Sequence, residues 1–85
     1  MFDVAYSKQA EKFFKKADKI LAKRLIKKID DLKNTPIIHD TKTIEGYEEK
    51  LFRVRVGDYR ILYEVGYKSN KIGIVKIDKR SKVYD

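Results

Sequence analysis

The stretch that decides the fold is residues 51–65, which read LFRVRVGDYRILYEV. Two runs rich in β-branched and aromatic residues flank Gly57 and Asp58. Glycine readily takes the positive φ that two-residue hairpin turns require, so the pattern predicts a β-hairpin with strands at 51–56 and 59–65. The register of this hairpin is the starting point for the rest of the fold.

The predicted register divides the hairpin into two faces. A two-residue turn pairs Val56 with Tyr59, and the two members of every pair share one face. The face that we expect to be the core side carries Phe52, Val54, Val56, Tyr59, Ile61 and Tyr63. The opposite face, which we expect to be exposed to solvent, carries the guanidiniums of Arg53, Arg55 and Arg60.

This group of arginines has two interpretations. Arginines that alternate along a solvent-facing strand are ordinary surface residues, and Asp58, Glu64 or Asp78 would neutralise part of their charge. However, Arg55 directly opposite Arg60 destabilises a sheet by roughly several tenths of a kcal/mol, which folding alone does not explain. An anion between them would turn that repulsion into affinity, and a guanidinium matches phosphate oxygens well. The sequence therefore favours a phosphate-binding face.

The residues before the hairpin predict one strand and two helices. Apolar residues alternate over 2–6, which is typical of a short strand. Ser7 stands at an N-cap position ahead of a helix over about 8–17, because apolar side chains follow at helical spacing. Asp18 stands in the same position ahead of a second helix, which ends before Pro36.

The remaining segments complete the predicted fold. Residues 36–49 show no sustained period and read as a long loop, part of which could extend the strand at 51–56. A further strand at 72–77 follows a turn at 69–70. The order strand-helix-helix-strand-strand-strand predicts a small single α+β domain over 1–85. We expect a mostly antiparallel four-stranded sheet with a helical hairpin packed on one face.

The composition limits the possible functions. The 85 residues contain 21 Lys and Arg against 13 Asp and Glu, and the resulting net charge of +8 indicates a polyanionic partner. The absence of Cys excludes disulfides and thiolate metal sites, and His39 as the single histidine excludes a multi-histidine metal centre. No apolar stretch approaches the ~20 residues of a membrane span, and no secretory signal is readable. We therefore expect a cytoplasmic protein.

The outer faces of the predicted helices are also basic. They carry Lys12, Lys15, Lys16, Lys19, Lys23, Arg24, Lys27 and Lys28. Such residues are either a solvated surface that keeps a small protein soluble or an electrostatic footprint for a nucleic acid. The sequence leaves both interpretations open.

The chain as a whole resembles a known family. The order of its elements, the block at 51–65 with its Tyr59-Arg60 pair, and the closing residues 79–84 are similar to the RelE branch of the RelE/ParE toxin superfamily. The resemblance implies a metal-independent, ribosome-dependent endoribonuclease without a cofactor that cuts messenger RNA in the A site. It also implies a RelB-like antitoxin partner that holds the toxin inactive.

The resemblance also assigns roles to residues. Arg60 and Arg80 match the arginines of the family that stabilise the scissile phosphate, and Tyr84 matches its C-terminal tyrosine near the substrate base. The expected catalytic residues are Arg55, Arg60, Arg80 and Tyr84, and the expected RNA-binding residues are Arg53, Arg55, Lys79 and Lys82. From the sequence alone, Tyr84 is equally compatible with stacking on a base and with packing back on the sheet.

Two positions depart from the family. Arg53 and Arg55 stand where better-known members have lysines, and an arginine almost never loses its proton. The general base is therefore one of four candidates: Glu48, Glu49, Tyr84 or a group of the ribosome. The sequence also leaves open whether the enzyme is weak or inactive. His39 is more consistent with a surface loop.

The implied chemistry needs few protein groups. The 2′-hydroxyl of RNA is the nucleophile, so the protein aligns it and stabilises charge on the phosphorane, and the product is a 2′,3′-cyclic phosphate. Two other functions share these features: a ParE-like toxin that inhibits a topoisomerase and a noncatalytic RNA-binding module. The combination of Arg60, Arg80 and Tyr84 favours the endoribonuclease.

Overall fold

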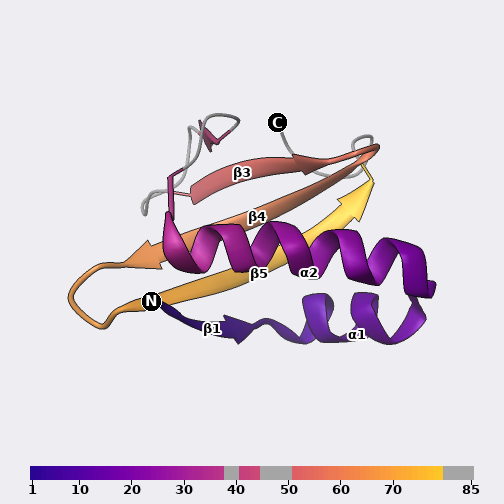
Figure 1. Ribbon diagram of the computed structural model, residues 1–85, viewed down its shortest axis with the longest axis horizontal. Coiled ribbons are helices and arrows are strands. Elements are labelled where there is room, and N and C mark those ends of the chain that lie inside the picture. The colour runs from indigo at the N-terminus through magenta and orange to yellow at the C-terminus, as the bar shows by residue number, and fades with distance from the viewer. Residues whose placement is uncertain (38–40, 45–50, 80–85) are drawn as a thin grey trace.

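The computed structural model describes residues 1–37, 41–44 and 51–79. Its elements follow the predicted order, with one additional strand. They are β1 (Asp3–Tyr6), α1 (Lys8–Lys16), α2 (Lys19–Asn34), β2 (Lys42–Ile44), β3 (Leu51–Val56), β4 (Tyr59–Gly66) and β5 (Lys71–Lys79). In Figure 1, α2 lies across the front of the sheet, and α1 follows β1 below it, beside the edge of β5. The expected α+β class is confirmed.

The sheet has five strands in the described part of the chain, in the order β1-β5-β4-β3-β2. β1 is parallel to β5, and all other neighbours are antiparallel. The prediction of four strands was wrong because Lys42–Ile44 pairs with Leu51–Arg53 inside the segment read as a loop. A strand of three residues is too short to show a period of its own, and its pairing with the edge of β3 defines it.

The hairpin of β3 and β4 has the predicted register. Val56 pairs with Tyr59, Arg55 with Arg60, and Arg53 with Leu62. Gly57 has a φ of 58°, in the left-handed region that favours glycine. The turn residues expected from the sequence therefore fix which side chains share each face.

Both predicted N-caps are confirmed. Ser7 Oγ accepts a hydrogen bond from the backbone N–H of Ala10 at 3.1 Å, and Asp18 Oδ1 accepts one from Leu21 at 2.8 Å. These bonds satisfy N–H groups that a helix leaves without an internal partner. Within the described ranges, neither helix is long and apolar enough to cross a membrane.

The first helix is fastened to the free edge of β5 beyond the end of β1. Ser7 Oγ donates to the carbonyl of Val75 at 2.7 Å. Gln9 Nε2 donates to the carbonyl of Ile77 at 2.7 Å, and the N–H of Ile77 donates to Gln9 Oε1 at 2.9 Å. These side chains replace a longer β1 and hold α1 against one edge of the sheet.

The main core lies between the helices and the sheet. It includes Ala10, Leu25, Ile29 and Leu32 from the helices and Val54, Val56, Ile61, Tyr63, Ile72, Ile74 and Ile77 from the strands. The Tyr63 hydroxyl donates to the carbonyl of Pro36 at 2.6 Å and forms a 3.0 Å hydrogen bond with Thr41 Oγ1. The chain leaving α2 is thereby attached to the centre of the sheet.

Candidate functional site

The face of the sheet away from the helices carries a row of charged residues next to the β3–β4 turn. Arg55 on β3 pairs with Arg60 on β4, which pairs in turn with Asp78 on β5. Directly paired side chains have Cβ atoms about 5 Å apart, so the two arginines are immediate neighbours. Asp78 Oδ1 also accepts the backbone N–H of Lys79 at 2.8 Å. One carboxylate therefore stands beside the arginine pair.

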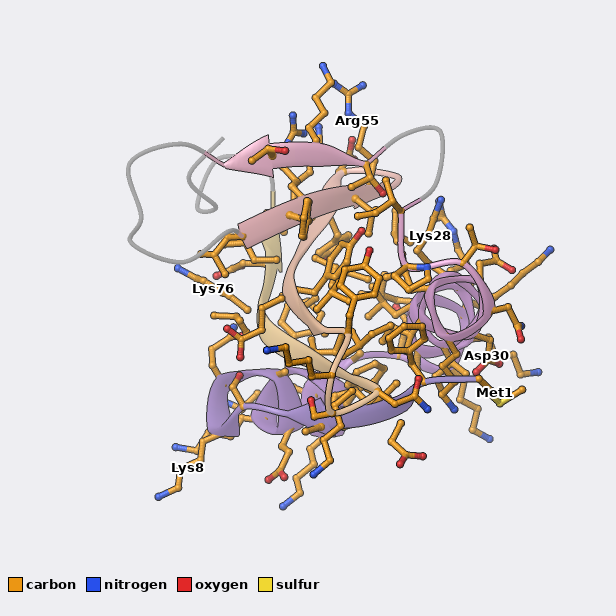
Figure 2. All side chains as sticks on the ribbon, turned by 90° about the vertical axis from the view of Figure 1, so that its left-hand side faces the viewer. Met1, Lys8, Lys28, Asp30, Arg55 and Lys76 are labelled. Carbon is orange, nitrogen blue, oxygen red and sulfur yellow. The ribbon has the colours of Figure 1, made fainter. Side chains whose placement is uncertain are left out.

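The next row on this face is also cationic. Lys42 pairs with Arg53, Arg53 with Leu62, and Leu62 with Lys76. Figure 2 shows Lys76 on the side of the sheet opposite α2. Three cations and one leucine from four strands thus form this row, and the two rows together concentrate positive charge on this face.

Two of the three arginines are buried, so the predicted exposure was wrong for them. Arg53 is 7% exposed and Arg60 is 3% exposed, whereas Arg55 is exposed. The face also contains a small apolar cluster of Leu51, Leu62 and Val75. Aliphatic stems of arginine cover apolar neighbours readily, which explains why a strand pattern that suggests a wet surface is partly packed.

Arg60 is held close to its own turn. Its Nη1 atom donates to the carbonyl of Tyr59 at 3.0 Å and to the carbonyl of Gly57 at 3.2 Å. Carbonyls orient a guanidinium without cancelling its charge. A buried, oriented charge is also screened less by water than an exposed one. Arg60 is therefore held in a fixed orientation beside the exposed Arg55.

The other predicted site residues fall into two groups. Lys79 is exposed at the end of β5 and pairs with Tyr59, so it lies at the same end of the sheet as Arg55 and Arg60 but, by this register, on the face toward the helices. The rest lie outside the described residues: Arg80, Lys82, Tyr84, and the loop candidates His39, Glu48 and Glu49. On the face away from the helices, the described part of the candidate site thus consists of Arg53, Arg55 and Arg60, with Lys79 at the same end of the sheet on the other face.

Sequence reasoning named the basic residues of the second helix but did not show that Arg24, Lys27 and Lys28 lie beside the end of β3. An open cleft of about 410 Å³ separates α2 from the end of β3. Its lining residues are Arg24, Lys27, Lys28, Asp31, Arg55, Val56 and Gly57. The spacing of its α2 residues, three or four apart, was visible in the sequence as one helical stripe, but the sequence did not show which stripe meets the sheet.

Comparison with known families identifies the fold. A family model described as the ParE toxin of the type II toxin-antitoxin system parDE matches residues 4–84. The chain belongs to the ParE toxin family. A search of curated proteins finds no match.

Solved structures place the toxin within the superfamily. A chain of the archaeal RelE–RelB complex from Pyrococcus horikoshii OT3 is 30% identical, with a TM-score of 0.82 over 96% of this chain and 98% of that chain. The RelB–RelE complex from Methanococcus jannaschii contains a chain that is 28% identical, with a TM-score of 0.70 and 94% coverage of both chains.

A more distant match shows only the shared fold. The isolated E. coli RelE toxin is 18% identical, with a TM-score of 0.79 over 93% of this chain and 84% of that chain. Together with the archaeal matches, it confirms the resemblance drawn from the sequence. The toxin is a member of the RelE/ParE superfamily, on its RelE branch.

Proposed function

We propose that this toxin is a ribosome-dependent endoribonuclease that cleaves messenger RNA in the A site. The observation that supports this most directly is the pairing of Arg55 with Arg60 at one end of the sheet. Lys79 ends β5 at the same end of the sheet, on the face toward the helices, and Arg80 follows it in the sequence. The likeness to chains of archaeal RelE–RelB complexes supports the same function.

The burial of these side chains suggests how they divide the work. Arg55 is exposed and can place its guanidinium directly on a phosphate, where two parallel N–H donors fit two oxygens. Arg60 is oriented by two carbonyls and adds positive potential at short range. In this proposal Arg55 binds the scissile phosphate while Arg60 stabilises the charge that develops on it.

The proposed reaction uses a nucleophile that RNA provides. The 2′-oxygen attacks phosphorus while the bond from phosphorus to the 5′-oxygen breaks, which leaves a 2′,3′-cyclic phosphate and a 5′-hydroxyl. One proton leaves the 2′-hydroxyl and one reaches the 5′-oxygen. Oriented cations that stabilise the extra charge of the phosphorane supply roughly several kcal/mol in such sites. For the groups that move the two protons, the candidates are those named from the sequence: Glu48, Glu49, Tyr84 and the ribosome.

An antitoxin completes the proposal. The archaeal structures similar to this chain are complexes of RelE with RelB, and we expect a RelB-like partner that forms a heteromer with this toxin in the cytoplasm. A chain with a net charge of +8 favours an acidic partner, since complementary charge accelerates association and neutralises the basic site.

The test is expression in growing bacteria with mapping of the 5′ ends of cellular messages. We expect the wild-type chain to arrest growth and to produce new ends within translated reading frames, and we expect Arg60→Ala and Arg80→Ala to relieve both effects. Lys68→Ala is the matched control, because Lys68 is an exposed cation in the turn at the far end of the sheet. Cleavage of free RNA at the same rate without ribosomes would refute ribosome dependence.

A second candidate function is inhibition of a topoisomerase, which the match to a ParE family model favours. The same experiment separates it from the first. Growth arrest with intact messages and impaired DNA supercoiling would indicate the ParE-type function. Arrest with intact messages, normal supercoiling and RNA binding would indicate a noncatalytic RNA-binding module.

A further inference from the structure

One carboxylate lies in the same row of the sheet as the arginine pair. Arg60 pairs with Arg55 on one side and with Asp78 of β5 on the other. Ile61 and Ile77, which follow Arg60 and precede Asp78, are paired in the core next to the helices. Successive side chains of a strand point to opposite faces, so Asp78 shares the outer face with both arginines.

The backbone around Asp78 is fixed from both sides. β4 pairs with it through Arg60, and Gln9 of α1 binds the residue before it, Ile77, at both its N–H and its carbonyl, at 2.9 and 2.7 Å. The carboxylate is oriented as well, because Oδ1 accepts the backbone N–H of Lys79 at 2.8 Å. Asp78 therefore has a defined position before any ligand binds, as a reacting group requires.

The second oxygen of this carboxylate remains available. Within the described ranges no group donates a hydrogen bond to Oδ2 of Asp78, and the residue is half-buried, so a ligand on the outer face can reach it. Aspartate is ordinarily ionised near pH 7 and then acts only as an acceptor of protons and hydrogen bonds. Arg53 and Arg55 cannot take this part, since a guanidinium keeps its proton.

We propose that Asp78 is the general base that takes the proton of the 2′-hydroxyl when a message is cut. This inference rests on the proposed function and assigns one of its two proton transfers. The proton passes to Oδ2 while the 2′-oxygen forms its bond to phosphorus. The bond from phosphorus to the 5′-oxygen breaks, the 5′-oxygen takes a proton from water, and Asp78 afterwards returns its own proton to water.

The spacing of the row suits this transfer. Arg55 and Arg60 hold the phosphate above β3 and β4 in the proposed function. In a conformer that is ready to react, the 2′-oxygen lies about 3–3.5 Å from phosphorus. Adjacent strands are about 4.8 Å apart, so a phosphate above β4 leaves its 2′-oxygen within reach of a carboxylate on β5. Binding and proton transfer would then occupy neighbouring strands of one row.

A second carboxylate on the same face provides the comparison. Glu64 lies four residues along β4 from Arg60, which is roughly 13 Å in a strand. Its Oε1 would lie 3.0 Å from a Cβ atom on Gly73, its partner on β5, so the side chain packs over that glycine. Among the described strand residues, Asp78 is thus the carboxylate that the register places next to the arginine pair.

The experiment measures single-turnover cleavage on programmed ribosomes by the full chain, with Asp78→Asn and with Glu64→Gln as the matched control. Each variant removes one negative charge from the same face. Asp78→Asn should lower the rate at saturating ribosomes about 100-fold at pH 7, since a general base contributes roughly 10²–10⁴. The control should stay within about twofold of the wild type, because salt screens a charge at that distance.

The ribosome concentration that gives half the maximal rate separates chemistry from charge. Removal of a carboxylate beside two phosphate-binding arginines should leave this concentration unchanged or lower it, because the outer face becomes more positive. A slower reaction with equal or tighter binding is therefore the expected signature of a lost proton acceptor. A midpoint of thermal unfolding close to that of the wild type excludes misfolding.

The pH profile identifies the proton transfer itself. Without the base, hydroxide must take the proton, so the log rate of Asp78→Asn should rise with pH more steeply than that of the wild type, by about one per pH unit. The charged neighbours of Asp78 are the same in both chains: Arg60 from β4 and Lys76 and Lys79 on β5. Gln9, which reaches this end of β5 from α1, is uncharged.

Chemical rescue provides a second signature. Formate should restore the rate of Asp78→Ala by about tenfold, because a small carboxylate can enter the space and take the proton. Chloride at the same ionic strength should restore nothing, since it is not a base.

Two results would overturn this inference while the proposed function stands. An Asp78→Asn rate within about threefold of the wild type would mean that another group takes the proton. A slower variant whose pH profile runs parallel to that of the wild type, without rescue by formate, would make Asp78 a positioning residue for Arg60. A wild-type chain that leaves ribosome-bound message intact would instead refute the proposed function, and the assignment of a base would fall with it.

Discussion

The two faces of the sheet are made from the same strands but differ in chemistry. On the face toward the helices, Val54 and Ile61 are buried among apolar side chains. On the opposite face, their sequence neighbours Arg53 and Arg60 are also buried, next to a small apolar cluster. Burial therefore does not separate Arg53 and Arg60 from their apolar neighbours on the other face, whereas charge does. The comparison suggests that one face supplies most of the stability and the other concentrates cations for binding.

The largest expected effect is loss of stability from the face toward the helices. Ile61→Ala should lower the free energy of unfolding by about 2–5 kcal/mol, because Ile61 is fully buried in the core and a cavity would remain. Urea unfolding of the purified wild type and variant measures this difference in the free energy of unfolding. A loss below about 1 kcal/mol would mean that the core relaxes around the cavity and that this face contributes less than the comparison requires.

An intermediate effect is expected on the opposite face, where a substitution should lower activity and leave stability intact. Arg55→Gln should lower the rate of message cleavage by about 10- to 100-fold, because it removes a guanidinium from the developing charge. The free energy of unfolding should stay constant or rise by roughly several tenths of a kcal/mol, since Arg55 stands opposite Arg60 and like charges repel. Cleavage on programmed ribosomes and urea unfolding provide the two measurements.

The matched control for Arg55 is Lys68→Gln, which removes one charge from the exposed turn between β4 and β5. Figure 1 places this turn at the opposite end of the sheet from the β3–β4 turn. Its cleavage rate should equal that of the wild type within about twofold, because salt screens the interactions of an exposed charge beyond about one Debye length. An equal loss of activity in both variants would contradict the assignment of the site to one end of the sheet.

The smallest expected effect concerns a phenol beside the helices. Burial raises the pKa of Tyr6 above its ordinary value of 10.0, Lys33 opposes this shift, and Asp30 adds to it. The folded chain therefore holds the Tyr6 proton more tightly than the unfolded chain does. This contribution to stability is complete below pH 10 and is lost as the pH rises through the higher pKa of the folded state.

Tyr6→Phe tests this contribution. The phenylalanine should keep the edge-to-face contact with Phe14, whose ring centroid lies 5.6 Å from that of Tyr6. The free energy of unfolding of the variant should fall less steeply above pH 10 than that of the wild type. Urea unfolding of both chains between pH 8 and pH 11 gives the difference, in which the other titrating groups cancel. Parallel curves for the two chains would show that Tyr6 ionises equally in the folded and unfolded states.

Local signals in the sequence predicted much of this structure. Gly57 predicted the hairpin turn, and the turn then fixed every pair from Val56–Tyr59 outward. Ser7 and Asp18 predicted the starts of the helices. These predictions succeeded because capping bonds and tight turns depend on residues within a few positions of each other. The pairing of β2 with β3 lacked such a signal and was missed.

The candidate site was predicted only in part, because burial depends on packing between distant segments. The register correctly brought Arg55 and Arg60 together, but the alternating pattern wrongly placed Arg53 and Arg60 in solvent. A strand pattern gives the face of each side chain but not what packs on that face. The lysines of α2 posed the same difficulty, since a helical stripe does not reveal its neighbour.

By itself, then, the sequence determined the order of the elements, the hairpin register and the positive charge, since each depends on local geometry or on composition. The tertiary structure alone decided that Arg53 and Arg60 are buried and that α2 brings Arg24 against Gly57. Burial and the contact of Arg24 with Gly57 both depend on segments far apart in the chain, and they exist only once those segments have packed together. The position of charge, in contrast to its amount, is a property of the folded chain.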